Sequence, residues 1–187
     1  MKYFTPELFA QANSDDEESA EQAAAQWEKA GRRYLKYIRG IRDKLPAKVG
    51  TFMDACNLHD AELHLAPGSP GFLPFWIRYG IDDQGPVLHA SLAFRQEGHE
   101  LTLNYGHLID RPTIARPVES PVFYQGVVIC LYDEFSSLRG GGTAHELLFS
   151  NGYMTRIRFR EFSYDRRPLA ERPTALFTEL SFRTATG

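Results

Sequence analysis

The stretch YDEFSSLRGGGTAHELLFSNGYMTRIRFREFSY, residues 132–164, decides the fold class, because two runs of alternating apolar residues flank Ser150-Asn151-Gly152. Asn-Gly between such runs is a strong signal for a β-hairpin. A two-residue loop would mix charged and apolar side chains on both faces. A three-residue loop, with Gly152 in the left-handed conformation, pairs His145 with Ile157 and Glu146 with Arg156. We predict this second register, because a slip of one residue would exchange the buried and solvent faces.

In the predicted register the apolar face carries His145, Leu147, Phe149, Tyr153, Ile157 and Phe159. The opposite face carries Glu146, Leu148, Met154, Arg156, Arg158 and Arg160. The three arginines form a column on one strand, and we expect a solvated strand face beside Glu134 and Glu146. A second interpretation is a site for phosphate or carboxylate, which guanidinium groups bind well.

The composition indicates one ordinary globular domain over residues 1–187, with 43% hydrophobic and 24% charged residues. The net charge of -3 argues against a general nucleic-acid or membrane-surface binder. Cys56 and Cys130 lie in apolar runs without metal or redox spacing, so we expect buried free thiols. The first residues are not followed by the apolar region of a signal peptide, and no apolar run approaches the ~20 residues of a membrane helix. We therefore expect a cytoplasmic protein.

Helix signals fill residues 1–56. Thr5-Pro6-Glu7 combines a cap, a proline at the first helical position and an acidic residue, which predicts a short helix to about Ala12. A capping box at Ser14–Glu17 predicts a long second helix, which Pro46 ends. A third short helix is expected around residues 47–56.

From Leu58 onward the hydrophobic period changes from that of a helix to that of a strand. The run Val127–Leu131 is apolar at both parities, which predicts a central strand buried on both faces, and the proline-rich segment 110–121 predicts a loop. Strands are expected at 73–81, 87–96, 99–109, 122–135, 143–149, 153–163 and 174–183. No helical segment separates them, so the prediction is an α+β fold, with N-terminal helices packed on a largely antiparallel sheet of about seven or eight strands over residues 57–187.

Four short motifs carry a resemblance: MKYFTPEL at residues 1–8, Leu58-His59-Asp60, the segment 131–135 (LYDEF), and the segment 145–148 (HELL). In this order they resemble the motifs of an uncharacterised bacterial family of unknown function. The resemblance implies a bacterial cytoplasmic protein, and it brings no known activity, cofactor or catalytic residues. The proline-rich insert at 110–121 departs from the family pattern.

Histidines and carboxylates are the best candidates for chemistry, since convergence of several strands could form a metal site or an acid–base pair. The candidate set is His59, His107, His145, Asp60, Asp110 and Asp133. Their spacing matches no HExxH or CxxC motif. His59 and His145 also fall on the apolar parity of their strands, which is typical of packed, hydrogen-bonded core residues.

Nucleophilic catalysis has less support, because the sequence contains no GxSxG motif and the glycine run 140–142 lacks the lysine of a phosphate-binding loop. We therefore expect a protein without catalysis or cofactor that binds a protein partner or a small anionic ligand. A metal-dependent hydrolase built on the histidine and aspartate set is the first alternative. Anion binding by Arg156, Arg158 and Arg160 is the second.

Overall fold

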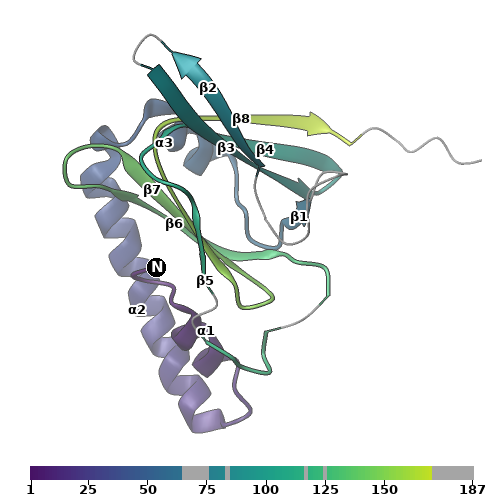
Figure 1. The fold of residues 1–187 in the computed structure, drawn as a ribbon. Coiled ribbons are helices and arrows are strands. Elements are labelled where there is room, and N and C mark those ends of the chain that lie inside the picture. Colours follow the sequence, from purple (N-terminus) through teal and green to yellow (C-terminus); the bar gives the residue numbers. More distant parts are fainter. Residues whose placement is uncertain (65–75, 83–84, 116–117, 124–125, 170–187) are drawn as a thin grey trace, which may run out of the picture.

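The computed structural model describes residues 1–64, 76–82, 85–115, 118–123 and 126–169, and Figure 1 shows their arrangement. The helical elements are α1 (Pro6–Ala12), α2 (Glu17–Ile41), the 3-10 turn η1 (Arg42–Lys44) and α3 (Ala47–Ala55). The strands are β1 (Glu62–His64), β2 (Trp76–Asp82), β3 (Gly85–Gln96), β4 (His99–Leu108), β5 (Thr113–Ala115), β6 (Cys130–Ser137), β7 (Thr143–Phe149) and β8 (Met154–Pro168). None of the helices in these ranges is long and apolar enough to cross a membrane.

The predicted helices are confirmed, with one change at a cap. Thr5 caps α1, since its hydroxyl oxygen accepts a hydrogen bond from the amide of Leu8. Asp16, rather than Ser14, caps α2, because its carboxylate accepts a hydrogen bond from the amide of Ser19 at 3.3 Å. A carboxylate at this position both accepts a free amide hydrogen and complements the positive end of the helix dipole.

The predicted α+β fold and antiparallel sheet are also confirmed. In the described ranges the sheet has eight strands in the order β1-β3-β4-β8-β7-β6, with β2 added to β3 and β5 added to β8. Every pair is antiparallel. The predicted loop at 110–121 contains the short strand β5, which pairs with the start of β8. The predicted strand at 174–183 lies outside the described residues.

The β7–β8 hairpin has the predicted register, with His145 opposite Ile157 and Glu146 opposite Arg156. Gly152 has a φ of 80°, and a Cβ there would lie 2.9 Å from the ring of Phe123. Ile157 is fully buried, whereas the side chain of Arg158 is 36% exposed. The hairpin therefore separates apolar from charged side chains as the alternation predicted.

The expected central position of Val127–Leu131 is wrong. Val127 is 58% exposed, and β6 begins only at Cys130. The strand buried on both faces is β7, where six of the seven residues are buried. Its outer face is covered because Leu148 packs in a second apolar cluster with Phe123 and Phe9. Leu148 is therefore buried on the face that the sequence pattern assigned to solvent.

The sheet curls until its two ends meet, and backbone hydrogen bonds join them. The amide of Cys130 donates to the carbonyl of Ala61 at 2.9 Å, and the amide of Leu63 donates to the carbonyl of Val128 at 2.7 Å. Between them Glu62 and Ile129 form an antiparallel bridge. This line of bonds, which we call the seam, closes the curled sheet, whose inner side packs with residues of α2 and α3 in the main apolar core.

Beyond the seam the edge of β6 is covered by α2, which runs beside it in Figure 1. The amide of Phe135 donates to the hydroxyl of Tyr34 at 2.7 Å, and that of Ser137 donates to the hydroxyl of Tyr37 at 3.3 Å. Burial, followed by the nearby charge of Asp133, raises the pKa of Tyr34 well above its usual value. The hydroxyl is thus neutral, and it satisfies an edge amide that no strand reaches.

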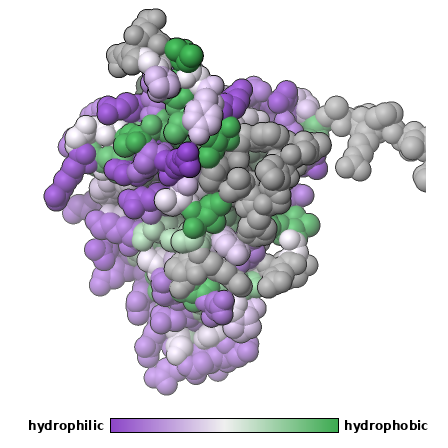
Figure 2. All heavy atoms as spheres, in the orientation of Figure 1, coloured by the Kyte–Doolittle hydropathy of each residue, from purple (hydrophilic) through white to green (hydrophobic). Residues whose placement is uncertain are grey.

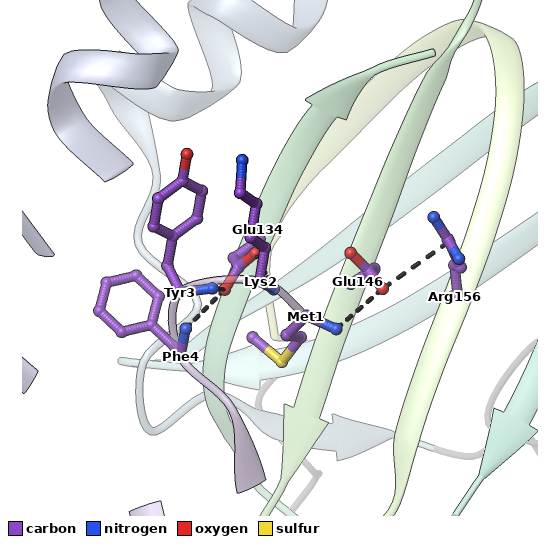
Figure 3. Close-up of polar contacts among 7 residues, drawn as sticks. All are labelled: Met1, Lys2, Tyr3, Phe4, Glu134, Glu146 and Arg156. Carbon is purple, nitrogen blue, oxygen red and sulfur yellow. Dashed lines mark hydrogen bonds and ion pairs between the residues drawn. The ribbon is translucent and has the colours of Figure 1, made fainter. Parts of the chain in front are cut away.

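The N-terminal segment is held by a buried carboxylate (Figure 3). Glu134, 3% exposed, accepts hydrogen bonds from the amides of Lys2 at 2.9 Å, Tyr3 at 2.7 Å and Phe4 at 2.6 Å. Glu134 also lies directly opposite Glu146, a pairing of like charges that by itself destabilises two adjacent strands.

Positive groups offset this repulsion on the side of Glu146. The α-amino group of Met1 lies 2.9 Å from Glu146 Oε1, and Arg156 Nε lies 3.7 Å from the same oxygen. Glu134, Glu146 and Arg156 therefore form one row across β6, β7 and β8, with the N-terminal segment bound to it.

Replacing Tyr34 by phenylalanine should leave the buried amide of Phe135 without an acceptor. We expect Tyr34→Phe to lower the free energy of unfolding by about 1–3 kcal/mol in urea denaturation. Tyr37→Phe is the matched control, because Ser137 is partly exposed and water can replace the lost acceptor, so its loss should be below about 1 kcal/mol. Equal losses in the two variants would contradict the role assigned to Tyr34.

Replacing Glu134 by glutamine keeps one acceptor oxygen but turns an amide group toward backbone N–H donors. We expect Glu134→Gln to lower the free energy of unfolding by about 1–3 kcal/mol and to speed hydrogen exchange at the amides of Tyr3 and Phe4. Glu21→Gln, the same change on an exposed face of α2, should stay within about 0.5 kcal/mol. Unchanged exchange at Tyr3 and Phe4 would show that Glu134 does not hold this segment.

Candidate functional site

A pocket with a cavity volume of about 270 Å³ lies beside the seam, and we call it the seam pocket. Its walls come from β1, the residues just before β6, β5 and the β7–β8 hairpin. The apolar lining residues are Leu63, Ile114, Val127, Val128, Phe149 and Tyr153. In Figure 2 hydrophobic atoms form several separate groups on the side of the sheet, whereas the outer surface of α2 is largely hydrophilic.

The polar lining residues of the seam pocket are Glu62, His64, Asn151 and Thr155. Two of them have partners within the protein: His64 Nε2 lies 3.2 Å from a guanidinium nitrogen of Arg95, and Asn151 accepts a hydrogen bond from the amide of Tyr153. Thr155 differs, because it is only 1% exposed and its hydroxyl has no hydrogen-bond partner among the described residues. A buried hydroxyl without a partner costs about 1–3 kcal/mol, and this oxygen is closed off from the pocket as well as from solvent.

The turn of the β7–β8 hairpin is fastened to the opposite wall of the pocket. The amide of Ser150 donates to the carbonyl of Ile129 at 2.9 Å, and the hydroxyl of Ser150 accepts from the amide of Ile129 at 3.0 Å. The same hydroxyl lies 3.4 Å from the carbonyl oxygen of Val127. These bonds hold the hairpin at a fixed distance from the 127–129 segment, so the seam pocket is formed without a ligand.

A second hollow, of about 410 Å³, lies on the outer side of β2, β3, β4 and β8. Its side chains are more polar: Arg78, His89, Ser91, Asn104, Glu161 and Ser163. Here the buried hydroxyl is satisfied, since Ser91 donates to Asn104 at 2.8 Å. Glu161 also pairs with His107 at 3.5 Å, so this hollow offers fewer reasons for a ligand than the seam pocket does.

His145 belongs to a buried polar network rather than to an open site. Its Nδ1 lies 2.8 Å from the hydroxyl of Tyr105, and its Nε2 lies 2.9 Å from Asp133 Oδ2. The ring of Phe135 stacks on the imidazole, with centroids 3.8 Å apart. A neutral imidazole protonated at Nε2 satisfies both bonds, with Tyr105 as donor and Asp133 as acceptor.

A carboxylate, an imidazole and a phenol follow one another in this network, as they could in an acid–base relay. Both His145 and Tyr105, however, are buried. Burial, with a further contribution from Asp133, raises the pKa of Tyr105 well above its usual value, so the phenol is a weak acid at neutral pH. A substrate needs direct access to the group that exchanges the proton. We therefore interpret the network as a satisfied polar part of the core, as the apolar parity of His145 predicted.

The other predicted metal-site residues lie in separate pairs. His59 lies 2.9 Å from Asp60 with its side chain 42% exposed, so the prediction of a packed core residue is wrong for His59. Asp110 lies 2.5 Å from Arg158. Within the described ranges no three histidine, cysteine or acidic side chains are close enough to share a metal ion.

The arginine column is largely occupied by the protein's own carboxylates. Arg156 pairs with Glu146, and Arg158 pairs with Asp110, whereas Arg160 is exposed. Since two of the three guanidinium groups already have anionic partners, the arrangement favours a structural role for the column.

Sequence reasoning did not find the seam pocket or Thr155. One signal was present: Thr155 shares its strand parity with Tyr153 and Ile157, which places a hydroxyl among inward-facing apolar side chains. The alternation could not show that the surrounding strands leave a cavity there.

Comparisons of this chain with protein-family models, with curated proteins and with solved structures returned no match. This outcome agrees with the resemblance to a family of unknown function, and it assigns no activity.

Both cysteines are free, and burial raises the pKa of each thiol, most strongly for Cys130. A raised pKa lowers the thiolate fraction at a given pH, and the thiolate is the reactive form. At pH 8 we expect Ellman's reagent to modify the partly exposed Cys56 slowly and Cys130 only after denaturation.

In Cys56→Ser the native protein should release almost no nitrothiobenzoate, and one equivalent should appear in guanidinium chloride. Two equivalents released at one rate from the native wild-type protein would contradict the buried position of Cys130.

Proposed function

We propose that this protein binds a small, mainly apolar molecule in the seam pocket and acts by binding rather than by catalysis. The observation that carries the proposal is a preformed cavity with six apolar lining residues and four polar ones. Ligand sites are typically concave and apolar with a few placed polar groups. The volume of about 270 Å³ is just below the ~300–1,000 Å³ range of such sites, which favours a compact ligand.

The geometry supports this function better than the other functions that the sequence suggested. The candidate metal ligands are divided among separate pairs, and two of the three arginines are paired with carboxylates. The expected anionic ligand also has little support in this pocket, because the charged residue of its lining is the acidic Glu62. A cytoplasmic location, expected from the sequence, is in keeping with the two free cysteines.

A protein partner has weaker support. Tyr79 and Ile81 on β2 are 73% and 89% exposed, but single exposed apolar residues are common on protein surfaces. A pocket that is already shaped and fastened by hydrogen bonds is the more specific feature.

The test uses N-phenyl-1-naphthylamine, a neutral apolar dye whose fluorescence rises in apolar surroundings. We expect saturable binding to the wild-type protein and an increase of at least about tenfold in Kd for Val128→Phe, because the larger side chain would occupy part of the cavity of about 270 Å³. Thermal unfolding of the variant checks that the fold is retained.

Ile81→Ser is the control for adsorption to the surface, since Ile81 is exposed and does not line the pocket. This variant should bind the dye like the wild-type protein. The proposal is contradicted if dye binding is absent or non-saturable, or if Val128→Phe leaves it unchanged.

A further inference from the structure

β2 lies at an edge of the sheet. Among the described residues it pairs with β3 alone, in a continuous register from Trp76 to Asp82. The β2–β3 hairpin forms the upper end of the molecule in Figure 1. An edge strand presents a row of backbone N–H and C=O groups to any strand that approaches it. β2 therefore offers a template for the addition of a further strand.

The side chains of β2 do little to protect this edge. Tyr79 and Ile81 are 73% and 89% exposed, although the hydroxyl of Tyr79 lies 3.5 Å from a guanidinium nitrogen of Arg111. The last part of β8 is different. Beyond Phe159 it pairs with β4 and no longer with β7, and it carries the charged run Asp165-Arg166-Arg167. Charged side chains commonly protect strand edges from other chains, whereas exposed apolar ones do not.

A proline in β3 identifies which residues of β2 direct their backbone groups to the free edge. Pro86 lies opposite Ile81 and has no N–H group, so this pair is one of the non-hydrogen-bonded pairs of the ladder. Such pairs alternate with hydrogen-bonded ones along two antiparallel strands. Ile77, Tyr79 and Ile81 therefore direct their N–H and C=O groups away from β3, and an added strand would bond to these residues.

The sequence of β2 is complementary to itself in one antiparallel register. If Gly80 lies opposite Gly80 of a second copy, Tyr79 lies opposite Ile81, and both residues of this pair have outward backbone groups. The same register places Arg78 opposite Asp82, in a non-hydrogen-bonded pair, where the side chains of two strands are closest. Because of the two-fold symmetry, the apolar pair and the charge pair each occur twice.

Other registers that keep the backbone bonds are less favourable. A slip of two residues places Arg78 or Asp82 opposite Gly80, so both charge pairs are lost. A slip of four residues places Arg78 opposite Arg78 or Asp82 opposite Asp82, and like charges directly opposite one another are destabilising. The pattern of charge thus favours the register centred on Gly80.

We propose that two copies of this chain pair through β2 in this antiparallel register, which joins their two sheets into one continuous sheet. The contact uses the same edge of both copies, so it closes as a two-fold dimer. The two exposed apolar side chains of each copy would then lie against those of the other. The inference goes beyond the proposed binding function, since neither Tyr79 nor Ile81 lines the seam pocket.

Sedimentation equilibrium of the purified protein tests the pairing. We expect a reversible dimer with a Kd on the order of 10 µM, because a contact between two edge strands is small. Arg78→Asp and Asp82→Arg each bring like charges together twice, so each should raise this Kd at least about tenfold. Arg160→Asp, the same change at an exposed position of β8, should leave the Kd unchanged.

An equimolar mixture of the Arg78→Asp and Asp82→Arg proteins tests the register. In a mixed dimer one strand contributes two acidic residues at positions 78 and 82, and the other contributes two arginines. Both charge pairs are then restored, so the mixture should form a heterodimer with a Kd close to that of the wild-type protein. Thermal unfolding of each variant checks that the fold is retained.

Hydrogen exchange of the wild-type protein tests the backbone bonds without any substitution. Raising the protein concentration should slow exchange at the amides of Tyr79 and Ile81, which would bond to the second strand. Exchange at Gly80 should not change, because the alternation directs its amide toward β3. This measurement also tests the pairing if a charge variant fails to fold.

Three results would overturn the proposal. The first is a wild-type mass that stays at that of a single chain up to about 500 µM. The second is a dimer that Arg78→Asp and Asp82→Arg leave intact, because the contact would then lie elsewhere. The third is a mixture of the two variants that does not regain the dimer, or exchange at Tyr79 and Ile81 that is independent of concentration, because the strands would then not pair in this register.

Discussion

The edge of β6 is the constraint on which the rest of this structure depends. An edge strand exposes backbone donors and acceptors, and these must be paired or covered. Here the start of β6 bonds to the backbone beside β1, and farther along the amides of Phe135 and Ser137 bond to two tyrosine hydroxyls of α2. The long helix must therefore lie along this edge. The N-terminal segment crosses the outer face of β6 and β7, where Glu134 accepts hydrogen bonds from its backbone amides (Figure 3).

The seam pocket also results from the pairing that joins the start of β6 to the chain beside β1. β1 (Glu62–His64) pairs with the chain just before β6, so the described junction is short. The β7–β8 turn is fastened to the same chain segment by Ser150. Inside the sheet the buried imidazole of His145 has partners on both ring nitrogens. Thr155 is also buried, and it lies at the border of the cavity.

The distribution of charge has a structural explanation. Glu134 and Glu146 face one another on adjacent strands, which is unfavourable without compensation. Three backbone amides bind the first carboxylate, and the α-amino group of Met1 and Arg156 lie beside the second. Of the arginine column, only Arg156 thus belongs to the network that attaches the N-terminal segment to the sheet, whereas Arg158 pairs with Asp110. The strand face that suggests an anion site in the sequence therefore has carboxylate partners from the same chain at two of its three arginines.

The sequence by itself determined the local structure of this protein. The alternation around Gly152 was enough to predict the register of the β7–β8 hairpin, since the side-chain period of a strand allows only one register to bury the apolar set. Cap residues and prolines likewise located the helices. The tertiary structure alone decided that β7, rather than 127–131, is buried on both faces, because this depends on what covers Leu148. The existence of the seam pocket also depends on the tertiary structure alone, because the walls of the pocket come from four segments far apart in the sequence. No local sequence pattern records how far apart such segments lie in space.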